Sequence, residues 1–124
     1  MPYTAPLRDL RHCLTNIITF DRLAETDRFA DAAPDTVAAI LDELAKLSSE
    51  TLAPLQVAGD AGCRVENGGV ITPEGFADGY AAIREGGWIG MAADPKHDGM
   101  VLPLTLQTVA NEMFASSCLA LSLC

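Results

Sequence analysis

Basic side chains are scarce in this sequence. Eight lysines and arginines stand against seventeen aspartates and glutamates, which gives a formal net charge of −9 at pH 7. Affinity for nucleic acid and for anionic membrane surfaces depends on lysine and arginine side chains that neutralise phosphate charge. The composition therefore argues against both as partners.

Long apolar runs are missing as well. A membrane-spanning helix needs about 20 consecutive apolar residues, and the least charged stretch, residues 100–124, is interrupted by Pro103 and Glu112. No basic and apolar leader of the kind found in signal peptides opens the chain. The length of 124 residues and the 49% hydrophobic content are typical of one globular domain. We therefore expect a single soluble domain with no membrane partner.

The cysteines show no C-x-x-C spacing. Cys13, Cys63, Cys118 and Cys124 are scattered along the chain, a usage typical of the reducing cytosol rather than of a disulfide framework. Two of the four could still pair, but we expect free, buried thiols that behave as small hydrophobic side chains. The expected location is cytoplasmic.

Motifs for metal binding and nucleophilic catalysis are also absent. His12 and His97 lack the clustered ligand spacing of a zinc site. No elbow such as G-x-S-x-G surrounds Ser116, Ser117 or Cys118, so we expect these small residues to pack at a helix crossing. The sequence therefore predicts no catalytic residue and no metal ligand.

What the sequence does contain is helical periodicity. Apolar residues at helical spacing, with Ile17 and Ile18 among them, predict a helix over residues 6–20. The acidic cluster in residues 21–33 predicts a solvated connector.

The most regular pattern follows over residues 37–55 and predicts an amphipathic helix. Asp35 or Thr36 would supply the N-cap oxygen, and Pro54 would limit the end of this helix.

Glycine is concentrated in residues 57–71, where we expect a short hairpin or an irregular loop turning at Asn67-Gly68. Thr72 and Pro73 then predict a helix start, and Gly86-Gly87 predicts its end. The expected buried stripe of this helix consists of Phe76, Tyr80 and Ile83.

Residues 89–102 show little periodicity and predict a loop, after which Pro103 opens a last helix. The expected buried side of this helix consists of Leu106, Val109, Ala110, Met113 and Phe114. No stop signal precedes Cys124, so we expect one unbroken helix that the chain truncates. It would leave Leu119, Leu121 and Leu123 exposed, which predicts a partner, a missing remainder or self-association.

Eight short motifs follow one another along most of the chain. They are Tyr3-x-Ala5-Pro6-Leu7-Arg8-Asp9, Leu52-Ala53-Pro54-Leu55, Gly59-Asp60-x-Gly62-Cys63, Thr72-Pro73-x-Gly75-Phe76, Gly87-Trp88-x-Gly90, Asp94-Pro95, Leu102-Pro103-Leu104 and Asn111-Glu112-Met113. In this order and spacing they resemble the N-terminal helical domain of acyl-CoA dehydrogenases, especially the branch that includes the methylthiopropionyl-CoA dehydrogenases.

The resemblance implies an all-α bundle, with a leading helix and acidic connector in residues 1–34 and the N-terminal domain, truncated in its last helix, in residues 35–124. It also implies FAD-dependent α,β-dehydrogenation of an acyl-CoA thioester by the complete enzyme. In that family the catalytic glutamate and most flavin contacts lie in later domains. We therefore expect this chain alone to bind no FAD, to contain no cofactor-binding residue and to have no activity. Activity would need the missing C-terminal portion or a partner subunit.

Aligned through Glu112, the resemblance places Leu121 and Ser122 beside the acyl tail, with plain core packing as the alternative for both. The loop departs from the family, which usually has a Gly-Gly pair and another glycine two residues on. Here the segment reads His97-Asp98-Gly99-Met100-Val101, and only Gly99 remains glycine. A different function, a non-catalytic helical interaction module acting through the apolar face of the last helix, stays open.

Overall fold

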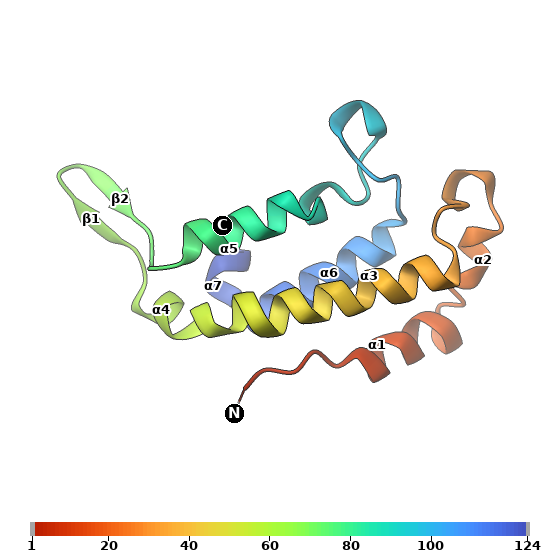
Figure 1. The fold of residues 1–124 in the computed structure, drawn as a ribbon, viewed down its shortest axis with the longest axis horizontal. Helices are drawn as coiled ribbons and strands as arrows, with labels where there is room; N and C mark the ends of the chain where they lie inside the picture. The colour runs from red at the N-terminus through yellow and green to blue at the C-terminus, as the bar shows by residue number, and fades with distance from the viewer. Residues whose placement is uncertain (1, 124) are drawn as a thin grey trace.

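The computed structural model describes residues 2–123, and helices dominate it (Figure 1). The helices are α1 (Leu7–His12), α2 (Asp21–Ala24), α3 (Pro34–Lys46), α4 (Gln56–Ala61), α5 (Phe76–Glu85), α6 (Leu104–Ser117) and α7 (Leu119–Ser122). Strands β1 (Arg64–Glu66) and β2 (Gly69–Ile71) pair antiparallel. Short 3₁₀ turns occur at Asp27–Phe29, Ala53–Leu55, Trp88–Gly90 and Pro95–His97. The expected all-α architecture is confirmed.

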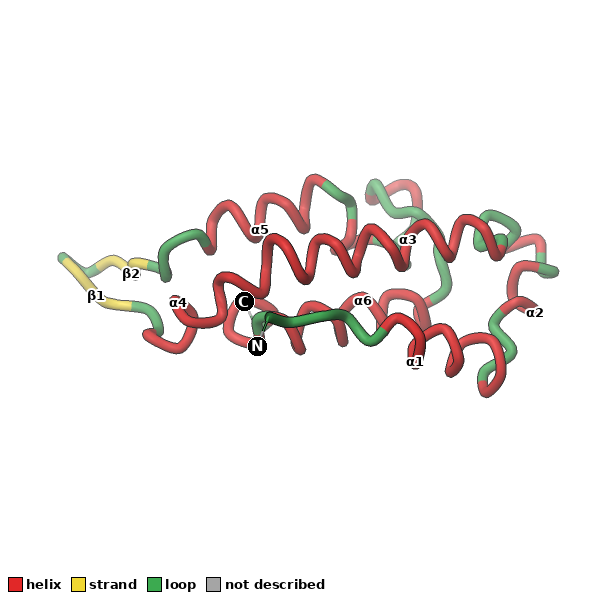
Figure 2. Tube along the Cα trace, turned by 60° about the horizontal axis from the view of Figure 1, so that its bottom comes forward, coloured by secondary structure: helices red, strands yellow, loops and turns green. Residues whose placement is uncertain are grey.

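The long helices share one direction. Helices α3, α5 and α6 run along the long axis of the molecule, and α1 lies beside α3 (Figure 1). Helix α6 packs against both α3 and α7. The hairpin projects beyond one end of the helices in both views (Figure 1, Figure 2).

One hydrophobic core joins the helices, and the hairpin adds no residue to it. The largest of its fully buried side chains are Phe20, Leu41, Leu44, Leu52, Met91, Leu106, Met113 and Cys118. Leu10, Leu14 and Phe20 of the leading segment belong to this core together with later residues. A domain boundary at residue 34 stays a prediction.

Two helices continue as π-helix, which the periodicity did not predict. Helix α1 continues over Cys13–Ile17, and α3 continues over Leu47–Leu52. In a π-turn the backbone hydrogen bond joins residues i and i+5 instead of i and i+4. The side chains that follow therefore point in other directions than they would in a continuous α-helix. The expected burial of Ile17 and Ile18 is therefore wrong, since both are exposed. The helix ends before residue 20, and Phe20 enters the core after Thr19, whose φ is 53°.

The expected solvated connector, residues 21–33, is only partly right. Its acidic side chains are exposed, but the segment contains α2 and a 3₁₀ turn. Ala32 is buried, and Leu23 and Phe29 pack against the core. These apolar contacts hold the segment against the core, although its charged residues face the solvent.

The start and end of α3 differ from expectation. Ala33 stands at the N-cap without a side-chain hydrogen bond, and Asp35 and Thr36 lie inside the first turn. Pro54 does not stop the chain from continuing into α4, because it lies in the first turn of a new 3₁₀ segment, where its missing N–H costs little. The glycine-rich stretch therefore begins inside a helix, with Gly59 buried.

The expected hairpin is confirmed within residues 64–71. Val65 pairs with Val70, and Glu66 pairs with Gly69. Asn67 and Gly68 form the two-residue turn with φ values of 51° and 79°, which is the type I′ geometry that matches strand twist.

Helix α5 begins later than expected. Its N-cap is Gly75, with φ 81°, rather than Thr72. Phe76 and Ile83 are buried as expected, but Tyr80 is 47% exposed. Gly79 is buried instead, because it lies against the side chains of Leu55 and Leu121. The end of α5 at Gly86-Gly87 is confirmed.

The expected buried side of α6 is confirmed for every residue, but the unbroken last helix is wrong. Cys118 adopts φ −151° and ψ 88° and separates α6 from α7. The hydroxyls of Ser116 and Ser117 donate to carbonyls of the preceding turn. Such side-chain bonds compete with the helical ladder at its end. Cys124 lies outside the described residues.

Candidate functional site

An uncharged groove of about 580 Å³ lies between α5, the turn Trp88–Gly90, α6 and α7. Its lining residues are Tyr80, Ile83, Trp88, Ile89, Gln107, Asn111, Phe114, Ala115, Leu119, Leu121, Ser122 and Leu123. None of these side chains carries a formal charge, although 20% of the chain is charged. The arrangement suits an apolar ligand, because binding desolvates no ion.

The groove has a buried floor and an exposed rim. Ile83, Phe114 and Leu121 are buried, whereas Leu119 and Leu123 are exposed. Exposed apolar side chains gathered around a concavity are typical of binding surfaces.

Both residues expected beside the acyl tail line this groove. Leu121 is buried on α7, and a Cβ on Gly79 of α5 would come within 3.0 Å of its Cδ2. Ser122 is exposed, and its hydroxyl donates to the carbonyl of Leu119 at 2.9 Å. The structure therefore brings Leu121 and Ser122 to one concave surface, while their contact with an acyl chain stays a prediction.

Two side-chain amides, those of Gln107 and Asn111, line one side of the groove. The Gln107 Nε2 atom donates to the Trp88 carbonyl at 2.9 Å and to Asn111 Oδ1 at 3.3 Å. These bonds tie the turn after α5 to α6. Sequence reasoning did not select these residues as site residues, although Gln107 and Asn111 are one helical turn apart and therefore share a face.

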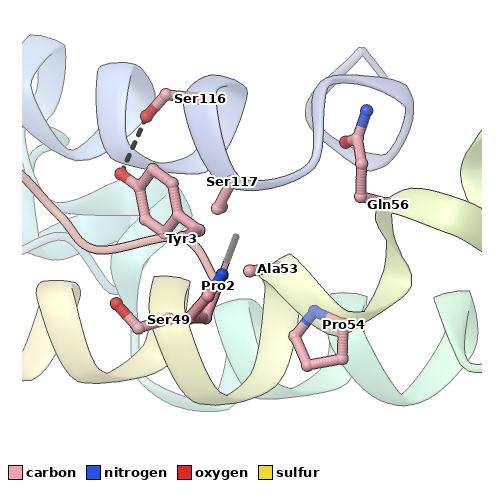
Figure 3. Close-up of a pocket in the computed structure, with 8 residues that line it drawn as sticks. All are labelled: Pro2, Tyr3, Ser49, Ala53, Pro54, Gln56, Ser116 and Ser117. Atoms are coloured by element: carbon pink, nitrogen blue, oxygen red, sulfur yellow. Dashed lines mark hydrogen bonds between the residues drawn. The ribbon is translucent and has the colours of Figure 1, made fainter.

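A second cavity, of about 460 Å³, lies beside the N-terminal segment (Figure 3). Tyr3 and Ser116 line it, and their hydroxyl oxygens are 2.8 Å apart. The Ser116 hydroxyl also donates to the Glu112 carbonyl at 2.7 Å, and the Ser117 hydroxyl donates to the Phe114 carbonyl at 3.0 Å. Both serines therefore bond to the end of α6. Ser117 is buried, as expected for a packing residue, whereas Ser116 is exposed, so the expected packing is wrong for Ser116.

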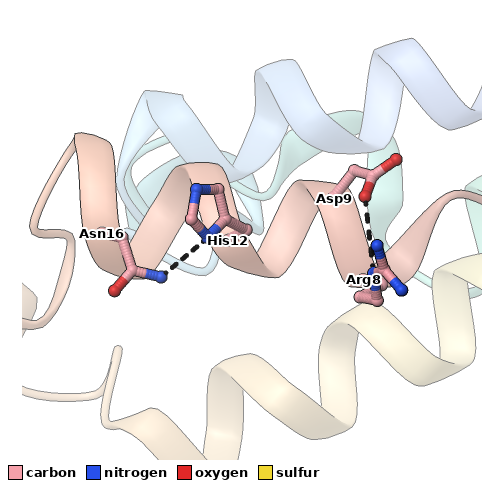
Figure 4. A network of polar contacts seen from close by, with 4 residues as sticks. All are labelled: Arg8, Asp9, His12 and Asn16. Carbon is pink, nitrogen blue, oxygen red and sulfur yellow. Dashed lines mark hydrogen bonds and ion pairs between the residues drawn. The ribbon is translucent and has the colours of Figure 1, made fainter.

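Within residues 2–123, no three His, Cys, Asp or Glu side chains come close enough to hold a metal. His12 Nδ1 lies 3.1 Å from the Asn16 amide on the exposed surface of the first helix (Figure 4). Cys13 and Cys63 are free and exposed, so the expectation of burial is wrong for them, whereas Cys118 is free and buried. The cytoplasmic location inferred from these cysteines stays a prediction.

The loop between α5 and α6 has positive φ at two residues that are not glycine. Asp98 has φ 58° and Val101 has φ 54°. Gly99 is needed for space, because a Cβ there would collide with the Ala93 carbonyl group. The loop therefore has a glycine-type backbone that contains a β-branched residue, and such residues rarely adopt positive φ.

No described helix is both long and apolar enough to cross a membrane.

Comparison with known proteins gives one line of evidence. No family model matches the chain. The chain is 30% identical over 125 residues to the 3-methylmercaptopropionyl-CoA dehydrogenase of Ruegeria pomeroyi, a match that covers 100% of this chain and 21% of that protein. The chain thus spans about a fifth of the length of the curated relative it matches. This similarity supports an acyl-CoA dehydrogenase-like relationship.

Proposed function

We propose that this chain is the N-terminal helical part of an acyl-CoA dehydrogenase-like flavoenzyme and forms one wall of its acyl pocket. The observation that carries the proposal is the uncharged groove at Leu121 and Ser122. The similarity to a named acyl-CoA dehydrogenase along the whole chain supports it. The substrate class is an acyl-CoA thioester.

The groove has the chemistry that an acyl chain needs. Each methylene group moved from water to an apolar surface contributes about 0.8 kcal/mol. Leu121 and Phe114 supply buried apolar surface, and Trp88 supplies an aromatic side wall. The amide of Asn111 and the hydroxyl of Ser122 supply polar groups that could set the orientation of a ligand.

The same residues do not fit FAD. A flavin dinucleotide carries a pyrophosphate, which proteins hold with cationic side chains or with backbone N–H groups at a helix N-terminus. No lining residue of the groove is cationic. FAD and the base that removes the α-proton therefore belong, in this proposal, to other parts of the complete enzyme, and we derive no step through the flavin.

Trp88 provides a direct test, because it is the only tryptophan and it lines the groove. Titration with octanoyl-CoA should change its fluorescence in a saturable way, whereas CoA without an acyl group should not. Leu123→Glu should weaken binding at least about tenfold, since it places a charge against the apolar ligand. Leu104→Glu is the matched control, because Leu104 is 70% exposed, close to the 77% of Leu123, and lies outside the groove. Equal responses to CoA and octanoyl-CoA would contradict the proposal.

Two further measurements address the reaction. The purified chain should show no flavin absorbance and no turnover of octanoyl-CoA with an electron acceptor. Retention of FAD or turnover by this chain alone would overturn the assignment of cofactor and base to other parts.

A second candidate function is a non-catalytic interaction module. The exposure of Leu119 and Leu123 on α7 favours it. This function predicts that octanoyl-CoA leaves the Trp88 fluorescence unchanged in the parent chain and in both variants, so the same titration separates the two functions.

A further inference from the structure

The β-hairpin is an exposed arm rather than part of the packed body. All six strand residues are exposed, and the hairpin projects past the helices (Figure 1, Figure 2). Val65 and Val70 lie directly opposite each other and are 77% and 67% exposed. A two-stranded hairpin is marginally stable alone, and further strands stabilise it.

The backbone of β1 has a free edge centred on Val65. In a two-residue hairpin the pair that flanks the turn, Glu66 and Gly69, is hydrogen-bonded, and bonded and non-bonded pairs alternate along the ladder. Val65 and Val70 therefore form a non-bonded pair. The N–H and C=O of Val65 point away from β2, toward the edge where another strand can add.

The side chains along this edge are complementary to a second copy of themselves. Arg64 and Glu66 precede and follow Val65 in β1, so their side chains share the face opposite to that of Val65. The Arg64 Nε and Glu66 Oε1 atoms are 3.2 Å apart. If a second β1 pairs antiparallel about a two-fold axis at Val65, Arg64 of each copy lies opposite Glu66 of the other. A two-fold interface requires such self-complementarity, and opposite charges across strands stabilise the pair.

We propose that β1 pairs with β1 of a second copy of this chain, which forms a four-stranded antiparallel sheet across a two-fold axis at Val65. One face of this sheet brings Val65 and Val70 of both copies together. The other face carries the two Arg64–Glu66 cross pairs. The interface is small, so the dimer is weak and depends on concentration.

Charge reversal tests the register. Sedimentation velocity over a concentration series should show dimerisation of the parent chain. Arg64→Glu places two like-charged pairs opposite each other and should weaken dimerisation about tenfold, as should Glu66→Arg. The double variant R64E/E66R should restore it, and a mixture of the two single variants should form a heterodimer. The net charge of −9 opposes association, so about 0.15 M salt is used to screen distant repulsion.

Disulfide trapping tests the contact itself. In a background where Cys13, Cys63 and Cys124 are serine, Val65→Cys places two thiols across the axis. The Cα atoms of a bonded antiparallel pair are about 5.5 Å apart, within disulfide range. Val70→Cys is the control, because two β2 strands would be separated by about 14 Å.

Val65→Cys should therefore cross-link at least about fivefold faster than Val70→Cys under the same mild oxidation. Equal cross-linking of the two variants would overturn the proposal. So would a parent chain that stays monomeric at its highest soluble concentration, or a dimer that Leu123→Glu abolishes and Arg64→Glu leaves unchanged. That last result would place self-association at the groove.

Discussion

The phenol oxygen of Tyr3 and the hydroxyl oxygen of Ser116 are 2.8 Å apart although 113 positions separate them in the chain. This hydrogen bond fastens the extended N-terminal segment to α6 (Figure 3). Ser116 is the second-last residue of α6 and is therefore close to the break at Cys118 that separates α6 from α7. The N-terminal segment is therefore held to the last turn of α6, the helix that precedes α7.

Tyr3→Phe removes this hydrogen bond and keeps the ring. We expect the free energy of unfolding to fall by about 0.5–1 kcal/mol, the usual net worth of one hydrogen bond. Urea denaturation of Tyr3→Phe, Ser116→Ala and the double variant measures the coupling. If the two effects simply add, the hydroxyls do not interact in solution.

Ser48 and Ser117 form a natural pair for testing buried hydroxyls. Both are buried, but Ser48 Oγ has no hydrogen-bond partner among residues 2–123, whereas Ser117 Oγ donates to the Phe114 carbonyl. Ser48→Ala removes an unsatisfied buried hydroxyl and should raise the free energy of unfolding by about 1 kcal/mol. Ser117→Ala should lower it by about the same amount. A loss of stability in Ser48→Ala would mean that its hydroxyl has a partner in solution.

Val101→Gly should stabilise the loop between α5 and α6. A left-handed backbone costs an L-residue about 1–2 kcal/mol, and glycine loses about 0.5–1 kcal/mol in chain entropy. The expected net gain in thermal or urea stability is about 0.5–1 kcal/mol. Val57→Gly, at an exposed helical position, is the control and should lower stability by about 0.5 kcal/mol. A destabilised Val101→Gly would show that packing of the valine outweighs its strain.

Gly79→Ala should loosen the contact between α5 and α7. A Cβ at Gly79 would lie 2.7 Å from Leu55 Cδ1 and 3.0 Å from Leu121 Cδ2. Overpacking of this kind costs about 1–3 kcal/mol, more than alanine gains from helix propensity. Gly90→Ala is the control, since the nearest atom to its Cβ would be 3.9 Å away. Equal melting temperatures of the two variants would contradict this account of the leucine contacts.

Local chemistry explains which sequence predictions were right. The buried side of α6, from Leu106 to Phe114, follows from helical periodicity. The hairpin turn at Asn67-Gly68 and the end of α5 at Gly87 follow from residues that tolerate positive φ. These features depend on neighbours within a few positions, so one stretch of chain contains the information.

Several of the wrong predictions concern contacts between distant segments. Tyr80 has the right spacing for burial, but Gly79 takes that place because Leu55 and Leu121 approach α5 there. The π-helical segment Leu47–Leu52 also lies against a distant part of the chain, because it contacts α6. No periodicity in one segment reports on such packing.

Composition and periodicity alone were enough to predict an acidic, helical chain with a turn at Asn67-Gly68, since charge and side-chain spacing are properties of short stretches. The structure decided that this turn joins two paired strands. The groove is different. Trp88, Gln107 and Leu121 come from three segments, and only folding brings them to one surface. The break at Cys118 buries Leu121 and leaves Leu123 exposed, because a change in backbone direction decides which side of α7 meets the core.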